Sequence, residues 1–239
     1  PSFAASCALA RSITQARMPV LILRAYDDGD TRLTFGPLGH DGPAGGSMAL
    51  DEGLPGSESV IGASELLADG VEATALPGEF GSHWHEHHTD AIDLYRKIMG
   101  PERIFGDGVI VDTMEVAGLW RSVGDLHAGV GAVFDEHAEM WGCHLSHPYR
   151  SGGSLYFTFL LRDADDESVR ARYRECWEAA IGAAHRAGGT MTHHHGVGLL
   201  RAPYLAEELG REGFRVLAAI KNALDPTGIM NPGKLLPEE

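Results

Sequence analysis

Apolar residues recur along this chain with two periods, one helical and one extended. Recurrence every three or four positions predicts helices at residues 2–17, 57–69, 90–99, 119–137, 169–187, 203–209 and 213–224. Alternation, or a short fully apolar run, predicts strands at residues 20–26, 31–35, 47–50, 109–115, 140–147 and 154–161. The chain therefore mixes helices and strands along its length.

Two pairs of these strands are spaced as hairpins. A polar Gly/Pro loop, residues 36–46, separates the strands at 31–35 and 47–50, and a Pro/Ser/Gly turn joins the last two strands. Hairpins separated by helices favour an antiparallel sheet with helices packed on one face, an α+β fold with ferredoxin-like units. No break in composition marks a second domain, so we predict one domain over residues 1–239 with a helical tail at 203–239.

The composition argues against several classes of protein. The 31 glycines form neither a strand–GxGxxG–helix unit nor a GxxxxGK[ST] loop, so no nucleotide-binding loop is encoded. A formal net charge of −15 argues against nucleic acid and anionic membranes as partners. No apolar run approaches the ~18 residues of a membrane-spanning helix. The 3 widely spaced cysteines are typical of reduced thiols, and we expect a cytoplasmic location.

Histidine is concentrated in two clusters, and the first lies at residues 83–88. There His83, His85 and His88 resemble the HxHxDH zinc motif of metallo-β-lactamase-type hydrolases. The expected strand does not precede them, and His87 occupies the aspartate position. A solvated loop is the favoured interpretation, and a zinc hydrolase is the alternative.

The second cluster is His193, His194 and His195, followed by Gly196 and Gly198. Successive side chains of an extended segment point to opposite sides, so at least one imidazole should face a polar cavity. Imidazole exchanges protons near neutral pH. The segment is therefore either an acid–base site or a polar loop.

Strand parity brings a further pair of side chains together. In a hairpin centred on Arg150, His144 and Tyr156 are direct neighbours across two strands, with Cβ atoms about 5 Å apart. Both lie on the less apolar face of the sheet. They form either an acid–base pair or an ordinary cross-strand contact.

These residues carry a resemblance to a known family. Residues 192–198 (THHHGVG) and 220–235 (IKNALDPTGIMNPGKL) resemble the C-terminal part of FAD-linked oxidases of the vanillyl-alcohol-oxidase type. The HHHGVG form is similar to the alkyldihydroxyacetonephosphate synthase branch. Shorter matches follow in order at residues 1–3, 23–27, 111–120 and 154–159. The resemblance covers nearly the whole chain.

The resemblance implies a cap domain that covers a flavin. The FAD-binding domain is expected N-terminal to residue 1 and would be this chain's partner, so the isolated chain is expected to be inactive. Tyr156, His193, His194 and His195 are implied to supply acid–base groups over the flavin. The reaction would be either oxidation of the substrate or acyl-for-alkyl exchange.

Other residues receive roles from the same resemblance. His144, Arg24 and Arg201 are assigned to the substrate side of the site, and His195, Asn231 and Lys234 to the cofactor side. His144 and Leu199 stand where the synthase branch has arginine and lysine, so the pocket loses fixed positive charge. The substrate is expected to be a small alcohol, a hydroxy acid or acyl-dihydroxyacetone phosphate, and a homodimer is possible.

Relatives that oxidise D-lactate and glycolate suggest a second interpretation. Some carry a His…His…Glu metal site, whose positions correspond here to His144, Tyr156 and His194. This set matches poorly, so no metal ligand is assigned. A metal-assisted D-2-hydroxy-acid dehydrogenase cap and a non-catalytic ferredoxin-like binding module are the alternative functions.

Overall fold

The computed structural model describes residues 2–17, 22–35, 47–51 and 91–236. The strands are β1 (Ile22–Tyr26), β2 (Ser47–Asp51), β3 (Val109–Leu119), β4 (Met140–Pro148) and β5 (Gly152–Arg162). The helices are α1 (Phe3–Gln15), α2 (Asp28–Phe35), α5 (Ala91–Met99), α6 (Val123–His137), α7 (Asp166–Arg186), α8 (Gly198–Arg201), the 3₁₀ turn η2 (Ala202–Tyr204) and α9 (Leu205–Leu224). The strands form one antiparallel sheet in the order β2-β1-β4-β5-β3.

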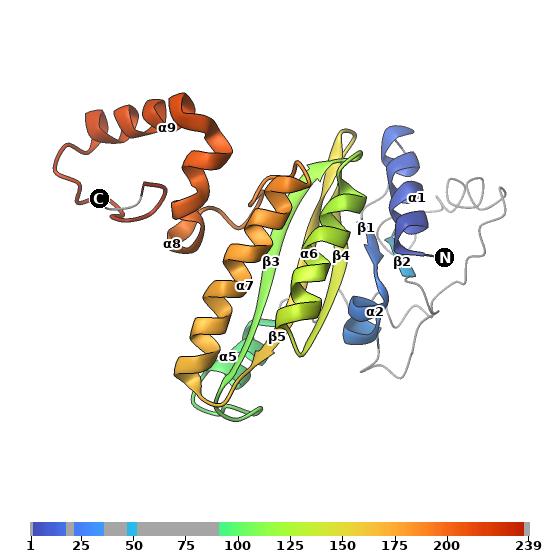
Figure 1. The fold of residues 1–239 in the computed structure, drawn as a ribbon. Coiled ribbons are helices and arrows are strands. Elements are labelled where there is room, and N and C mark those ends of the chain that lie inside the picture. Colours follow the sequence, from blue (N-terminus) through green and yellow to red (C-terminus); the bar gives the residue numbers. More distant parts are fainter. Residues whose placement is uncertain (1, 18–21, 36–46, 52–90, 237–239) are drawn as a thin grey trace.

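Three long helices, α1, α6 and α7, pack on one face of this sheet (Figure 1). Alternate residues of β5, Leu155, Phe157 and Phe159, point into this layer and are at most 1% exposed. Phe134 of α6 stacks on Phe159 with ring centroids 4.6 Å apart. The core therefore lies between the sheet and these helices, as the predicted α+β fold requires, and the opposite face carries the polar side chains of Glu115, His144 and Tyr156.

One ferredoxin-like unit, β3–α6–β4–β5–α7, forms the centre of the described chain. Its strands lie in the order β4-β5-β3, as in the first three strands of that motif. After α7 the chain returns beside β3, where Thr190 forms a single antiparallel bridge with Ala117 in place of a fourth strand. The chain then turns across the sheet, which places the histidine cluster at residues 193–195 over β3 and β5.

The predicted strand at residues 31–35 is wrong, because these residues belong to α2. The Asp27 carboxylate accepts the N–H of Asp30 at 2.8 Å and caps the first turn, to which Asp28 adds a further negative charge. β2 pairs along its length with β1 instead. The predicted loop at 36–46, the predicted helix at 57–69 and the histidines at 83–88 lie outside the described residues.

Several sequence-based boundaries shift by a few residues, and a predicted helix break is confirmed. β3 continues to Leu119, so α6 begins at Val123 rather than at residue 119. Between the two predicted C-terminal helices, Gly210 breaks α9 with a φ of 69°, a conformation that glycine adopts without a Cβ penalty.

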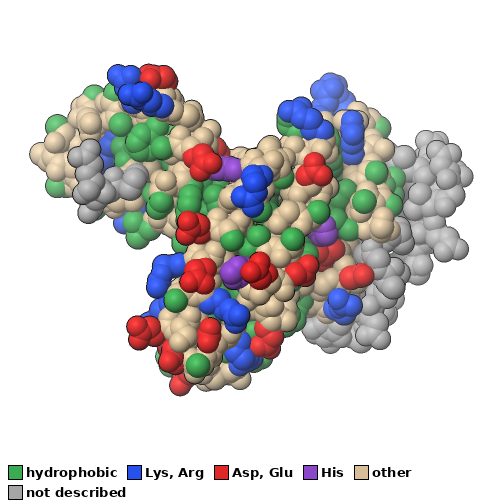
Figure 2. Space-filling view, in the orientation of Figure 1, with side chains coloured by type: hydrophobic (Ala, Val, Ile, Leu, Met, Phe, Trp, Pro, Cys, Tyr) green, Lys and Arg blue, Asp and Glu red, His purple; other side chains and the backbone are tan. Residues whose placement is uncertain are grey.

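The C-terminal part of the chain extends away from the sheet and forms a separate lobe (Figure 1). Apolar side chains gather on the surface of this lobe (Figure 2), and Val216, Ile220 and Leu224 are 61%, 52% and 82% exposed. None of the described helices is both long and apolar enough to cross a membrane.

Candidate active site

The polar face of the sheet carries the pair that strand parity predicts. His144 of β4 and Tyr156 of β5 are register partners, and their rings stack with centroids 5.3 Å apart. His144 Nδ1 lies 2.9 Å from an Asp30 carboxylate oxygen, and Asp30 is only 4% exposed. Gly142 makes this contact possible, because a Cβ there would overlap the backbone of Asp30. The predicted His144–Tyr156 neighbourhood is confirmed, and a carboxylate from α2 orients the imidazole.

Glu115 of β3 is the residue that organises the histidine cluster. It pairs with Tyr156 in the β3–β5 register and is 0% exposed. One carboxylate oxygen, Oε2, accepts the backbone N–H groups of His193, His194 and His195 at 2.8, 3.0 and 3.4 Å. The three histidines are thus held over the sheet through their backbone, which leaves their side chains available for other contacts.

Two opposing effects act on the pKa of the Glu115 carboxyl group. Burial raises this pKa, and the amide N–H groups of His193, His194 and His195 lower it by hydrogen bonding to the charged form. The amides prevail, so the pKa lies below its ordinary value. Glu115 is therefore a carboxylate at neutral pH despite its complete burial.

His194 lies between two tyrosines. Its Nδ1 is 3.1 Å from the Tyr156 hydroxyl and its Nε2 is 3.2 Å from the Tyr149 hydroxyl. A neutral imidazole has one donor and one acceptor nitrogen, so one tyrosine accepts a hydrogen bond while the other donates. His147 lies beside His194 with ring centroids 4.3 Å apart, and His195 meets Tyr156 edge-on at 5.1 Å.

The pKa values of two side chains in this group, Tyr156 and His147, are shifted in the direction that favours the neutral form. Burial, reinforced by the charge of Glu115, raises the pKa of Tyr156. Burial and the neighbouring His194 lower the pKa of His147. At neutral pH the phenol of Tyr156 thus keeps its proton, and its nearest hydrogen-bond partner, His194, can receive or return one.

Two arginines were assigned to the substrate side from the sequence, and they differ in how they relate to Tyr156 and the histidine cluster. Arg24 of β1 is close enough to influence the pKa of both Tyr156 and His147. Arg201 is 7% exposed: it donates to the carbonyl groups of Met191 and Gly196 and lies 4.7 Å from the Trp177 ring. It therefore braces the histidine segment from behind.

The two C-terminal residues assigned to the cofactor side are not brought to the tyrosines. Asn231 and Lys234 follow α9 in the lobe that extends away from the sheet (Figure 1). Asn231 has a φ of 50°, and the Lys234 ammonium donates to the Pro232 carbonyl. Within the described chain, this segment contacts neither Tyr156 nor His194.

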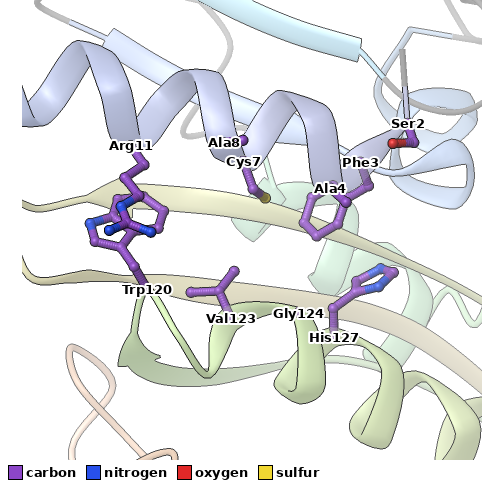
Figure 3. A pocket seen from close by; sticks show the side chains of 10 residues that line it. All are labelled: Ser2, Phe3, Ala4, Cys7, Ala8, Arg11, Trp120, Val123, Gly124 and His127. Atoms are coloured by element: carbon purple, nitrogen blue, oxygen red, sulfur yellow. The ribbon is translucent and has the colours of Figure 1, made fainter.

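A separate cavity of about 370 Å³ opens on the helical side of the sheet, between α1 and α6 (Figure 3). Phe3, Cys7 and His127 line it, and the imidazole Nε2 of His127 lies 3.0 Å from an Asp27 carboxylate oxygen. The sheet separates this cavity from the face that carries Tyr156, so it contributes no group to the candidate site.

Comparison with known proteins decides the family. The chain matches the family model "FAD linked oxidases, C-terminal domain" over residues 1–235. It belongs to this family. The resemblance found in the sequence is confirmed, and the domain takes the fold expected of it.

Several members of this family are similar to the chain. It is 28% identical to the alkyldihydroxyacetonephosphate synthase of Trypanosoma brucei brucei, over 99% of this chain and 42% of that protein. It is 33% identical to the glycolate oxidase subunit GlcD of Bacillus subtilis (strain 168), over 58% of this chain and 27% of that protein. The chain thus spans less than half the length of either relative.

Solved structures share the fold at low sequence identity. An alkyldihydroxyacetonephosphate synthase structure superposes with a TM-score of 0.62 at 17% identity, over 97% of this chain and 42% of that one. A 4-ethylphenol oxidase from Gulosibacter chungangensis gives 0.56 at 16% identity, over 98% and 51%. The α+β architecture of this chain is therefore shared with solved proteins whose names state different activities.

The three positions that the sequence resemblance relates to a metal site hold a different set of side chains here. These positions correspond to His144, Tyr156 and His194, but the Nδ1 of His144 contacts Asp30 and a phenol replaces the second ligand. Among the described residues, the donor atoms that come together are those of Glu115, His193 and His194, all within 4.8 Å of one another. His144, Tyr156 and His194 therefore do not form the His…His…Glu ligand set that the resemblance suggests.

Proposed function

We propose that this chain is the cap domain of an FAD-dependent enzyme, in which Tyr156 and His194 transfer a proton to and from the substrate beside the flavin. The observation that carries the proposal is the 3.1 Å contact between the Tyr156 hydroxyl and His194 Nδ1, on the sheet face opposite the core. FAD would be held mainly by a domain N-terminal to residue 1. The family to which the chain belongs supports this arrangement.

When bound, FAD would supply the electrophilic, hydride-accepting ring. The chain's own residues perform the acid–base part. Tyr156 presents a neutral phenol, its raised pKa keeps the proton in place until a substrate group approaches, and His194 takes up or returns that proton. Tyr149, on the other imidazole nitrogen, completes a path from Tyr156 to the exposed edge of the site. Glu115 holds His194 in position through its backbone.

The substrate of such a site would carry an anionic group. Arg24 supplies positive charge on the same face of the sheet, and His144, oriented by Asp30, lies between Arg24's strand and Tyr156. We therefore place a phosphate or carboxylate towards Arg24 and the reacting carbon towards Tyr156. His195 would contact the cofactor side of Tyr156, which it meets edge-on. Arg201 would support the histidine segment from behind. Asn231 and Lys234, in the C-terminal lobe, would serve the cofactor side.

Two reactions are consistent with this arrangement. Acyl-for-alkyl exchange on a dihydroxyacetone phosphate ester is favoured, because a synthase of that kind matches 99% of the chain. Oxidation of a 2-hydroxy acid is the alternative, supported by the similarity to a glycolate oxidase subunit and to the mitochondrial D-lactate dehydrogenase [cytochrome] of Arabidopsis thaliana.

The experiment that separates the two uses the protein in which this chain is joined to its FAD-binding domain. Under anaerobic conditions, D-lactate and glycolate are compared with acyl-dihydroxyacetone phosphate plus a fatty alcohol. Exchange gives an ether product without lasting loss of oxidised-flavin absorbance, whereas a hydroxy acid leaves the flavin reduced. A protein that binds FAD and gives neither result would refute the proposed function.

A cytoplasmic location and a homodimer also belong to this proposal. The acidic surface and the family relationship support a protein that works in aqueous solution. Sedimentation of the joined protein would test the dimer, and fractionation of cells would test the location.

A further inference from the structure

Only one of the two carboxylate oxygens of Glu115 accepts hydrogen bonds from described residues. Oε2 accepts the backbone N–H groups of the histidine cluster. Oε1 is buried, and within the described residues it has no hydrogen-bond partner. A buried, ionised oxygen without a partner is costly, and such atoms call for an explanation in a folded protein.

Two imidazole nitrogens face this oxygen. His193 Nδ1 lies 3.8 Å and His194 Nδ1 lies 3.9 Å from Oε1. Both distances are too long for hydrogen bonds. One donor atom from each of Glu115, His193 and His194 lies within 4.8 Å of the other two. Tetrahedral Zn²⁺, with bonds of about 2.0–2.2 Å, requires ligand atoms about 3.3–3.6 Å apart. The two imidazoles are 37% and 33% exposed, so their side chains have room to close this gap.

We propose that Glu115, His193 and His194 form a binding site for one divalent cation of the zinc type. One carboxylate oxygen and two imidazole nitrogens are a donor set that suits Zn²⁺. The backbone is already fixed for this purpose, because Oε2 holds both histidine amides. Solvent can provide the fourth ligand from the exposed side. This set takes its carboxylate from β3, and thus differs from the set at His144, Tyr156 and His194.

Metal binding and the Tyr156–His194 hydrogen bond exclude each other. Both use the Nδ1 lone pair or proton of His194, so a cation at this nitrogen releases the Tyr156 hydroxyl. An imidazole must be deprotonated at the ligating nitrogen, so protons compete with the cation for this site. Where the chain is part of an enzyme, the cation would inhibit it. That consequence alone rests on the proposed function.

Calorimetric titration of the chain with Zn²⁺ tests the site without flavin or substrate. In the parent protein for this test, His83, His85 and His88 are changed to alanine, which removes the other histidine cluster. We expect one bound Zn²⁺. His193→Ala should weaken its affinity by at least about tenfold, because loss of a ligand exceeds the ~10-fold minimum effect of losing an outer-shell partner. His195→Ala, whose ring faces Tyr156 instead, is the matched control and should bind as the parent does.

Two further variants sharpen the test. Glu115→Gln should also lose Zn²⁺ affinity, and its circular dichroism shows whether the fold is retained. Should it unfold, the exposed His193→Ala variant carries the test. Tyr156→Phe should bind Zn²⁺ at least as tightly as the parent, because it removes a competitor for His194. The proposal is overturned if the parent binds no Zn²⁺, if His193→Ala binds it as tightly as the parent, or if Tyr156→Phe weakens it.

Discussion

Replacing Glu115 with alanine removes the acceptor of three consecutive amide N–H groups. Two of these hydrogen bonds are short, 2.8 Å to His193 and 3.0 Å to His194, and the third, to His195, is 3.4 Å. A hydrogen bond to a charged group contributes about 1.5–3 kcal/mol. Because the substitution also removes an imperfectly satisfied buried charge, the net loss should be smaller than the sum, about 2–4 kcal/mol.

This loss should be concentrated in the histidine segment. Native-state hydrogen exchange would therefore show faster exchange of the amides of His193 and His194, by roughly 30- to 1,000-fold for a loss of 2–4 kcal/mol. Urea unfolding gives the global effect, and Glu102→Ala, a change at an exposed glutamate in a turn, is the control. If Glu115→Ala left exchange and the urea midpoint within error of Glu102→Ala, the role assigned to Glu115 would be wrong.

Three other predictions concern the charge of Glu115, the contacts of Arg201 and the packing of Phe134. The pKa of Glu115 is lowered in the folded chain, so the contribution of its charge to the free energy of unfolding is complete above the ordinary value of 4.5 and is lost as the pH falls below it. The difference in stability between wild type and Glu115→Gln should therefore shrink below about pH 4.5. A pH-independent difference would contradict this. Arg201→Leu removes two hydrogen bonds to carbonyl groups and the contact with Trp177, and should cost about 2–4 kcal/mol in urea unfolding; a loss below about 0.5 kcal/mol would refute the bracing role. Phe134→Ala should cost about 3–5 kcal/mol, because Phe134 is 0% exposed and stacks on Phe159; a change near zero would show that this core is not tightly packed.

The pairing of His144 with Tyr156 could be predicted because it depends on short-range rules. Side chains alternate along a strand, and a tight turn fixes the register of a hairpin. The turn pairs Pro148 with Gly153, and the β-bulge between Leu145 and His147 shifts the register by one residue before His144 is reached. This bulge, which the sequence analysis did not include, is what places His144 opposite Tyr156. The same short-range rules explain why the fold class could be predicted.

α2 shows where alternation misleads. Thr31, Leu33 and Phe35 alternate with polar residues, which is the pattern of a strand. The Asp27 carboxylate instead caps a helix there, and it is held in place by the N–H of Cys143 on a distant strand. The cap is visible in the sequence, but its tertiary support is not.

Glu115 was missed because its role depends on residues 78 to 80 positions away. The sequence shows only a carboxylate between two apolar residues, Met114 and Val116, of a predicted strand. That signal indicates a buried charge with a partner, and it does not name the partner. The packing of Arg201 was missed for a similar reason. The sequence alone does not distinguish an arginine that contacts substrate from one that packs against Trp177.

The most direct test of the central claim compares two tyrosine variants of the protein joined to its FAD-binding domain. Tyr156→Phe removes the hydroxyl that contacts His194, and Tyr95→Phe removes one from an exposed tyrosine of α5. Single-turnover kinetics of flavin reduction or acyl exchange should slow by about 10²–10⁴-fold in Tyr156→Phe, with FAD content and unfolding midpoint unchanged. Tyr95→Phe should react at the wild-type rate. Equal rates in the two variants would contradict the assignment of Tyr156 to proton transfer.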